Sequence, residues 1–337
     1  MFISFRFTIL ISLLCFSLTG AAQKLRFNIN GEFKIVQFTD VHYKIHDARS
    51  NAAIKCIDAV LEAEQPDLVV FTGDIVYSAP ADSGLVDVLS RVAKAKVPFA
   101  LVFGNHDDER GLTRSQLYDV ARKVPYCLLP DRGDVASPDY TLSIGSHDGK
   151  QTAAVLYMID SHSYSKLDGI KGYDWIKHEQ ISWYRERSQQ FAAKNGGKPL
   201  PSLAFFHIPL PEYGYAAADQ SAIISGTRME AACAPKINSG MFTAMREQGD
   251  VMATFVGHDH DNDYCVMHHN LLLCYGRFTG GNTEYNHLKN GARVIVMKEG
   301  ERKFETYIRE RSGQVVDRTQ YPDSYVKDNW KARPIEE

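Results

Sequence analysis

Short apolar runs that end abruptly in polar residues recur along the chain. Five of them are followed by clusters of polar side chains: residues 33–38, 68–71, 99–103, 203–206 and 251–256. Runs of this length, rich in Val, Ile and Phe and polar on neither side, are typical of strands buried on both faces. Three further runs predict additional strands, and therefore more than one sheet: residues 154–159, 271–275 and 293–297.

Helical patterns lie between several of these runs. Apolar residues recur at helical spacing over residues 54–61, after a possible N-cap at Ser50, and again over residues 181–191. A third helix is predicted over residues 242–248, ending at Gly249. Residues 213–236 are rich in Ala, Ser and Gly, which predicts a loop. Strands that alternate with helices predict an α/β fold with largely parallel pairing.

The polar clusters contain side chains that can hold metal ions. In parallel sheets ligands bind beyond the carboxyl ends of the strands, so five distant segments are expected to converge on one site. The clusters supply imidazole, carboxylate and carboxamide groups, a set suited to Zn, Fe, Mn or Ni. Their candidate residues are Asp40, His42, Asp74, Asn105, His106, Asp107, His207, His258 and His260. The spacing of Asp40 and His42 at a strand end predicts that both project to one side.

The order of these clusters resembles that of the calcineurin-like metallophosphoesterase superfamily, which includes the purple acid phosphatases. The match covers residues 33–280 and includes all five clusters. The sequences of three segments resemble those of smaller purple-acid-phosphatase-like proteins of plants and fungi: residues 205–212, 238–240 and 257–263. The resemblance implies a four-layer αββα sandwich, in which two mixed sheets are flanked by helices.

The resemblance also implies a centre of two divalent metal ions. One ion is expected on Asp40, His42, Asp74 and His260, and the other on Asp74, Asn105, His207 and His258. Asp74 would bridge the two. A pair of cations can deprotonate a bridging water and hold phosphoryl oxygens for in-line attack.

His106 follows a ligand without being one in the family scheme. We expect it to stabilise developing charge or to protonate the leaving oxygen. Asp107 is expected to orient or charge that imidazole. Tyr213, Arg110 and Arg277 are interpreted as solvated loop residues rather than substrate contacts.

The chain departs from the purple acid phosphatases near the first metal. Those enzymes carry glycine at the position of His42 and use a tyrosine three residues after the bridging aspartate. Here both His42 and Tyr77 are present. Neutral imidazole is a good ligand near pH 7, whereas a tyrosine must first lose its proton. His42 is therefore the predicted ligand, and a colourless or weakly coloured protein is expected.

Three functions are compatible with these residues. The leading hypothesis is hydrolysis of small phosphomonoesters, and hydrolysis of phosphodiesters or nucleotides is the alternative within the same chemistry. A non-catalytic, metal-dependent binding protein is the alternative of a different class. Residues 108–180 are expected to form much of the pocket wall, and their sequence does not indicate which substrate binds.

The first residues resemble an export signal. An apolar segment, residues 7–18, follows Arg6 and precedes the small residues 19–22. Because this segment is too short to span a bilayer, we expect cleavage after Ala22 and a periplasmic or secreted protein. A buried N-terminal helix is the alternative. Residues 23–337 are expected to form one domain, with no membrane attachment after cleavage.

Charge and cysteine content add two expectations. The chain has 38 basic and 41 acidic residues among 337, which gives a net charge of −3 and predicts no stable nucleic-acid binding. Oligomeric state cannot be read from the sequence. Five cysteines follow residue 22, so at least one is unpaired or pairs between chains. Cys265 and Cys274 would face each other in a hairpin about residues 269–270, either bridged or as two free thiols.

Overall fold

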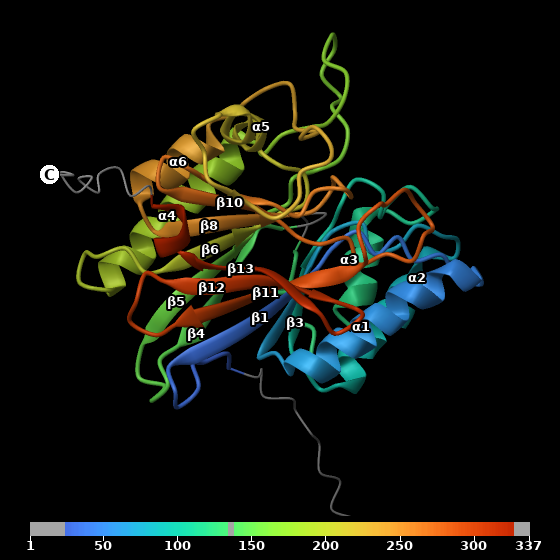
Figure 1. The fold of residues 1–337 in the computed structure, drawn as a ribbon, viewed down its shortest axis with the longest axis horizontal. Coiled ribbons are helices and arrows are strands. Elements are labelled where there is room, and N and C mark those ends of the chain that lie inside the picture. The colour runs from blue at the N-terminus through green and yellow to red at the C-terminus, as the bar shows by residue number, and fades with distance from the viewer. Residues whose placement is uncertain (1–23, 134–137, 327–337) are drawn as a thin grey trace, which may run out of the picture.

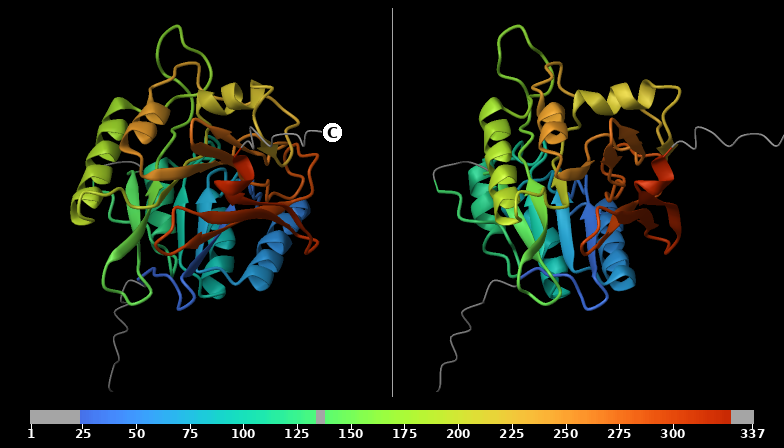
Figure 2. Two further views of the ribbon diagram at one scale, coloured as in Figure 1. Left: turned by 60° about the vertical axis from the view of Figure 1, so that its left-hand side comes forward. Right: turned by 90° about the vertical axis from the view of Figure 1, so that its left-hand side faces the viewer.

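The computed structural model describes residues 24–133 and 138–326, so the predicted signal peptide, residues 1–22, lies outside the described residues. Two sheets lie face to face between two sets of helices, as Figures 1 and 2 show. This arrangement confirms the predicted four-layer α/β sandwich. Among the described residues, no helix combines the length and the apolar character that a bilayer crossing requires.

The first sheet has six strands. In spatial order they are β13 (Val315–Tyr321), β12 (Phe304–Glu310), β11 (Gly291–Lys298), β1 (Glu32–Phe38), β2 (Leu68–Thr72) and β3 (Phe99–Val102). Strands β1, β2 and β3 are parallel, whereas β11, β12 and β13 join by antiparallel pairing. The sheet is therefore mixed, and its parallel half carries three of the predicted polar clusters.

The second sheet has seven strands. In spatial order they are β4 (Tyr140–Gly145), β5 (Thr152–Met158), β6 (Ser202–Phe205), β8 (Val251–Val256), β10 (Leu271–Tyr275), β9 (Cys265–His268) and β7 (Ile224–Ser225). Strands β5, β6, β8 and β10 are parallel. The other two polar clusters follow β6 and β8 at the carboxyl end of this parallel core.

Burial on both faces explains the uninterrupted apolar runs. Along β5, Leu156 belongs to the core between the sheets, while Tyr157 belongs to the core under the outer helices. Phe255 of β8 lies edge-on to Phe304 of β12 with ring centroids 6.0 Å apart, which joins the two sheets directly. No strand of this parallel core has a solvated face, so polar alternation would place unpaired groups in an apolar layer.

Helices cover the outer faces of both sheets. Three lie against the six-stranded sheet, α1 (Asn51–Glu64), α2 (Ala81–Lys94) and α3 (Arg114–Ala121). Three lie against the seven-stranded sheet, α4 (His178–Lys194), α5 (Pro211–Ala218) and α6 (Met241–Gln248). Helix α6 ends at Gly249 with φ of 70°, as predicted.

Two local predictions need correction. Helix α1 begins after Ser50, but the Ser50 hydroxyl accepts the backbone N–H of Lys44 at 2.9 Å and does not cap the helix. The loop predicted over residues 213–236 begins too early, because α5 continues to Ala218. Pro211 in the first turn favours a helix start, and Tyr213 packs the helix into the core.

The predicted hairpin forms with the expected register. Leu271 faces His268 and Cys274 faces Cys265 in the antiparallel pair of β9 and β10. The two cysteines form a disulfide with Cα atoms 4.1 Å apart. The remaining cysteines among the described residues, Cys56, Cys127 and Cys233, are free.

Candidate metal centre

Five loops at the carboxyl ends of parallel strands meet where the two sheets adjoin. The structure brings together all seven predicted ligands, and every one of them is buried: Asp40, His42, Asp74, Asn105, His207, His258 and His260. They follow β1, β2, β3, β6 and β8, which are distant in sequence. Each loop starts where a parallel strand ends, so strand pairing groups the loops after β1, β2 and β3 in one sheet and those after β6 and β8 in the other, and the packing of the two sheets brings the two groups together.

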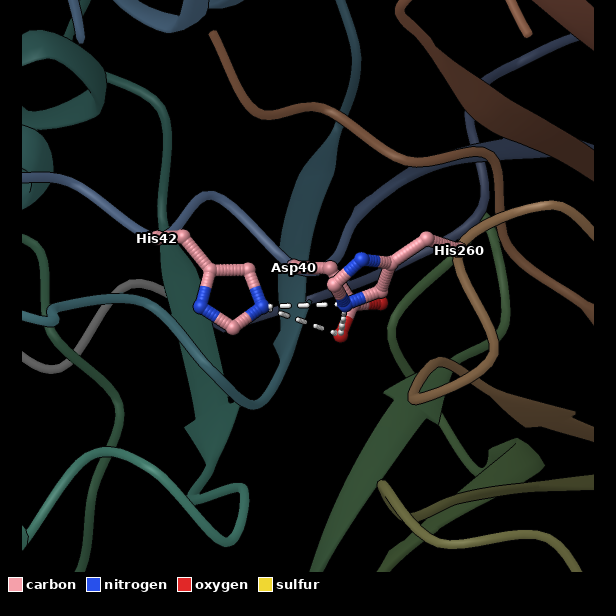
Figure 3. A group of neighbouring side chains, drawn as sticks. All are labelled: Asp40, His42 and His260. Carbon is pink, nitrogen blue, oxygen red and sulfur yellow. Dashed lines mark hydrogen bonds and ion pairs between the residues drawn. The ribbon is translucent and has the colours of Figure 1, made fainter. Parts of the chain in front are cut away.

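The first group contains Asp40, His42 and His260 (Figure 3). The Nε2 atoms of His42 and His260 are 3.1 Å apart, and they lie 3.9 and 3.7 Å from Oδ1 of Asp40. Nδ1 of His260 is 2.9 Å from the carbonyl oxygen of Tyr285, so Nδ1 carries the proton and Nε2 keeps its lone pair. Three ligand atoms therefore converge, which suits one cation.

The second group contains Asp74, His207 and His258. Nε2 of His207 lies 3.1 Å from Oδ2 of Asp74 and 3.2 Å from Oδ1 of Asn105. Nδ1 of His207 donates to the Thr72 carbonyl at 2.7 Å, an outer hydrogen bond that aims Nε2 at the centre. The carboxamide oxygen of Asn105 therefore lies beside this group.

Asp74 lies between the two groups. Its Oδ2 is 3.1 Å from His207 and 3.7 Å from Nε2 of His42. Its Oδ1 accepts the backbone N–H of His106 at 2.8 Å. One carboxylate oxygen thus faces ligands of both groups while the other is fixed by backbone, which is the position expected of a bridging residue.

The electrostatics of the centre fit cations. Burial lowers the pKa of His42 and of His258 well below the usual imidazole value, so both rings are neutral and offer lone pairs. Burial would lower the pKa of His207 too, but the Asp74 carboxylate raises it to about 9, so metal binding would displace a proton. Nδ1 of His42 and Nε2 of His258 are buried, with no hydrogen-bond partner among the described residues.

Asp40 and His42 point to the same site, but not because of their spacing along a strand, as the sequence predicted. Both residues follow the end of β1 and have positive φ, 51° and 44°, so strand alternation does not place them. Close backbone approach matters as well. A Cβ on Gly257 would overlap the side chains of Thr39 and Asp40, so only glycine allows the loop after β8 to reach the first group.

Asp107 does not contact the His106 imidazole, contrary to the prediction. Its Oδ2 accepts the N–H groups of Asp74 at 3.0 Å and Gly104 at 2.7 Å, and its Oδ1 accepts those of Ile75 at 2.7 Å and Val76 at 3.0 Å. The side chain is fully buried. Asp107 therefore fastens the loop after β2 to the loop after β3.

His106 lies at the edge of the centre. Its side chain is 31% exposed, and its ring centroid is 5.6 Å from that of His42. Its Nδ1 lies 2.9 Å from Oε2 of Glu109, a residue that the sequence interpretation missed. The only sequence signal for this contact is the three-residue spacing between a histidine and an acid.

Tyr77 packs beside His106. The two ring centroids are 5.1 Å apart, and the guanidinium of Arg110 lies 4.0 Å from the Tyr77 ring centroid. Arg110 is exposed, as expected, but the same prediction is wrong for two other residues. Tyr213 is buried and bonded to Thr254, and Arg277 is buried in an ion pair with Asp263.

Comparisons with known proteins agree with this geometry. Residues 33–262 match the family described as calcineurin-like phosphoesterase. The chain is 36% identical to "Probable inactive purple acid phosphatase 29" of Arabidopsis thaliana, over 86% of this chain and 84% of that protein. It is 36% identical to "Phosphatase DCR2" of Saccharomyces cerevisiae, over 77% of this chain and 50% of that protein.

A solved structure has the same fold. The dimetal phosphatase from Danio rerio superposes with a TM-score of 0.59 over 86% of this chain and 98% of that one. At 15% identity this likeness concerns the fold alone.

Proposed function

Because the chain belongs to the calcineurin-like phosphoesterase family, we propose that it is a phosphohydrolase that uses two divalent metal ions and acts on small phosphomonoesters. Asp40, His42 and His260 would hold one ion, and His207, His258 and Asn105 the other, with Asp74 shared. The position of Asp74 between the two donor groups carries this proposal. Iron, manganese, zinc and nickel all suit the nitrogen and oxygen donors.

When bound, the two ions would supply an activated water and electrostatic stabilisation of the phosphoryl oxygens. The protein's own contribution begins with orientation. Outer hydrogen bonds to Thr72 and Tyr285 fix the rings of His207 and His260. His106 is the proposed acid, because its ring is partly exposed and its backbone N–H is held by the shared carboxylate of Asp74. It would give a proton to the leaving oxygen.

The name of the Arabidopsis relative includes the word "inactive", so a binding protein without catalysis is the alternative to test. A non-catalytic metal-dependent binding protein would need the seven ligands but would not need His106 beside them. The chain keeps both the ligand set and this histidine, and one relative bears the name of a phosphatase. These observations favour an enzyme over a binding protein.

The decisive experiment is hydrolysis of a panel of phosphomonoesters and phosphodiesters, with manganese, zinc, iron and nickel added separately to metal-free protein. We expect monoester turnover with at least one metal and a loss of about 100-fold or more in Asp74→Asn. Preferential diester turnover would select the alternative substrate class. Protein that binds two metal equivalents without hydrolysing either ester class would establish the binding-protein alternative.

We also propose that the protein is exported, acts in an oxidising compartment as a periplasmic or secreted protein, and has no nucleic-acid or membrane partner after cleavage. The apolar segment at residues 7–18 and the disulfide of Cys265 and Cys274 support export. N-terminal sequencing of the mature protein tests it. A mature chain that begins at Met1 would contradict it.

A further inference from the structure

Glu109 connects His106 to a second loop. One oxygen of its carboxylate, Oε2, lies 2.9 Å from Nδ1 of His106. The other, Oε1, accepts the Tyr164 hydroxyl proton at 3.2 Å. The same hydroxyl oxygen lies 3.3 Å from Nδ2 of Asn105, which donates to it. Three hydrogen bonds thus connect the four side chains in a row from His106 to Asn105, and the peptide bond between Asn105 and His106 closes the ring.

The Tyr164 side of this path is itself anchored. The Ser163 hydroxyl donates to the Asn105 carbonyl at 3.1 Å, which holds the loop against the ligand. Tyr164 stacks on Tyr173 with ring centroids 5.7 Å apart, and Tyr173 lies edge-on to His258 at 4.3 Å. The loop that carries both tyrosines is therefore held against Asn105 and His258, two proposed ligands of the second metal ion.

An exposed acid three residues from a histidine would ordinarily be a weak surface pair. Here both side chains are 31% exposed rather than fully solvated, and both oxygens of Glu109 are used. A carboxylate that accepts from Nδ1 fixes the tautomer and the orientation of the imidazole. Nε2 is then the ring nitrogen that remains for a substrate.

We propose that Glu109 is a positioning residue for His106 and that Tyr164 holds Glu109 in place. This inference rests on the proposed function. In the step itself, the Nε2–H bond of the His106 imidazolium breaks as an O–H bond forms on the leaving oxygen. The bond between phosphorus and that oxygen breaks with its electron pair staying on the oxygen, and an oxygen atom from water takes its place on phosphorus. Glu109 keeps its charge throughout, and the imidazole is left neutral with its proton on Nδ1.

The kinetic test compares Glu109→Ala, Glu109→Gln and Tyr164→Phe on phosphomonoesters whose leaving groups differ in pKa. Asp108→Asn is the matched control, because it removes a charge from the same loop without contacting His106. In Glu109→Ala we expect kcat to fall about 30-fold for an alkyl phosphate and about 3-fold for 4-nitrophenyl phosphate, since a good leaving group needs little protonation. KM and metal content should be unchanged.

Glu109→Gln keeps an acceptor for Nδ1, so its kcat should fall less than that of Glu109→Ala. In Tyr164→Phe we expect kcat for the alkyl ester to fall about 3-fold. In Asp108→Asn kcat should stay within about 2-fold of the wild type. An equal loss for all leaving groups, or no loss, would overturn the proposal.

A second readout does not depend on turnover. Nitrogen-15 NMR of the metal-loaded protein reports which ring nitrogen of His106 carries the proton. For the neutral imidazole we expect the proton on Nδ1 in the wild type and in Tyr164→Phe, and a mixture of tautomers in Glu109→Ala. An unchanged tautomer in Glu109→Ala would refute the role of Glu109. A wild type that hydrolyses no ester would instead refute the proposed function, and the NMR result would still decide the role of Glu109.

Discussion

The carboxylate of Asp107 accepts the backbone N–H of Asp74 at 3.0 Å, so one buried acid positions another. Three further N–H groups, those of Ile75, Val76 and Gly104, also donate to Asp107. Burial and the neighbouring Asp74 raise the pKa of Asp107 to about 6. The two loops that carry Asp74 and Asn105 thus depend on one side chain for their relative position.

We expect Asp107→Ala to lower the free energy of unfolding by about 3 kcal/mol, because it leaves several buried N–H groups without an acceptor. Asp107→Asn keeps one acceptor oxygen and should lose less, about 1–2 kcal/mol. Urea unfolding of both variants provides the measurement, with Asp108→Ala as the control from the same loop. Equal stability of Asp107→Ala and the control would contradict the structural role.

The metal content of alanine variants should distinguish the proposed ligand His207 from the proposed acid His106. His207→Ala removes a ring aimed at the second group, so bound metal should fall towards one ion per chain and activity by about 100-fold or more. His106→Ala should lose about 100-fold in kcat with metal retained. Metal analysis and kinetics of both variants decide this, with His147→Ala as a control, because His147 pairs with Glu299 away from the centre. Equal metal loss in both would remove the distinction.

Iron-loaded protein should be colourless or weakly coloured. His42 lies in the first group, 3.1 Å from His260 by their Nε2 atoms, while the Tyr77 ring is covered by Arg110 and Lys44. We expect no strong visible charge-transfer band, and the same spectrum in Tyr77→Phe. His42→Ala should weaken iron binding. An intense band that Tyr77→Phe abolishes would place Tyr77, and not His42, on the iron.

Stability should depend on pH through Asp139, which lies apart from the metal centre. Burial raises the pKa of this acid to about 6, despite hydrogen bonds from the Asp160 N–H and the Gln180 amide. Between about pH 4 and pH 6 the folded state keeps a proton that the unfolded state releases, so this group costs stability as pH rises.

Asp139→Asn preserves an acceptor oxygen without the charge. It should therefore match the wild type near pH 4 and exceed it by about 1–2 kcal/mol at pH 7. Urea unfolding at the two pH values tests this, with the exposed Asp168→Asn as control. A gain that is the same at both pH values would exclude titration of Asp139 as the cause.

Peptide mapping without reductant should find Cys265 linked to Cys274, and Cys56, Cys127 and Cys233 as free thiols. Cys265 and Cys274 are buried in facing strands, so the pair forms within one chain. Replacing both by serine should lower the free energy of unfolding by about 2–3 kcal/mol, as for other short disulfide loops. Recovery of all five cysteines as thiols would refute the bridge.

Much of the fold was readable because the strands are buried on both faces. A segment such as Leu68–Thr72 is recognisable as a buried strand because it lacks polar alternation, and the residue after it, Gly73, marks its end. Helix α2 was missed although Leu85, Val88 and Leu89 follow helical spacing, and α5 was taken for a loop because its small residues carry a weak pattern. Strand β12 and the edge strand β13 were also missed.

The sequence by itself determined which residues meet at the centre. Parallel strands end at one edge, so the polar residues that follow β1, β2 and β3 lie together in one sheet and those that follow β6 and β8 lie together in the other, and the packing of the two sheets joins them. The types of these side chains also limited the chemistry to nitrogen and oxygen ligands. Both inferences use only local sequence patterns.

Only the tertiary structure decided what surrounds each of these residues. Asp107 was assigned to His106 by proximity in sequence, yet its carboxylate binds backbone groups 31 to 33 residues away. Glu109 took the place beside His106, and its second partner, Tyr164, lies 55 residues along the chain. Hydrogen bonds depend on direction and distance in space to within a few tenths of an ångström, and no sequence spacing specifies those when the partners come from separate loops.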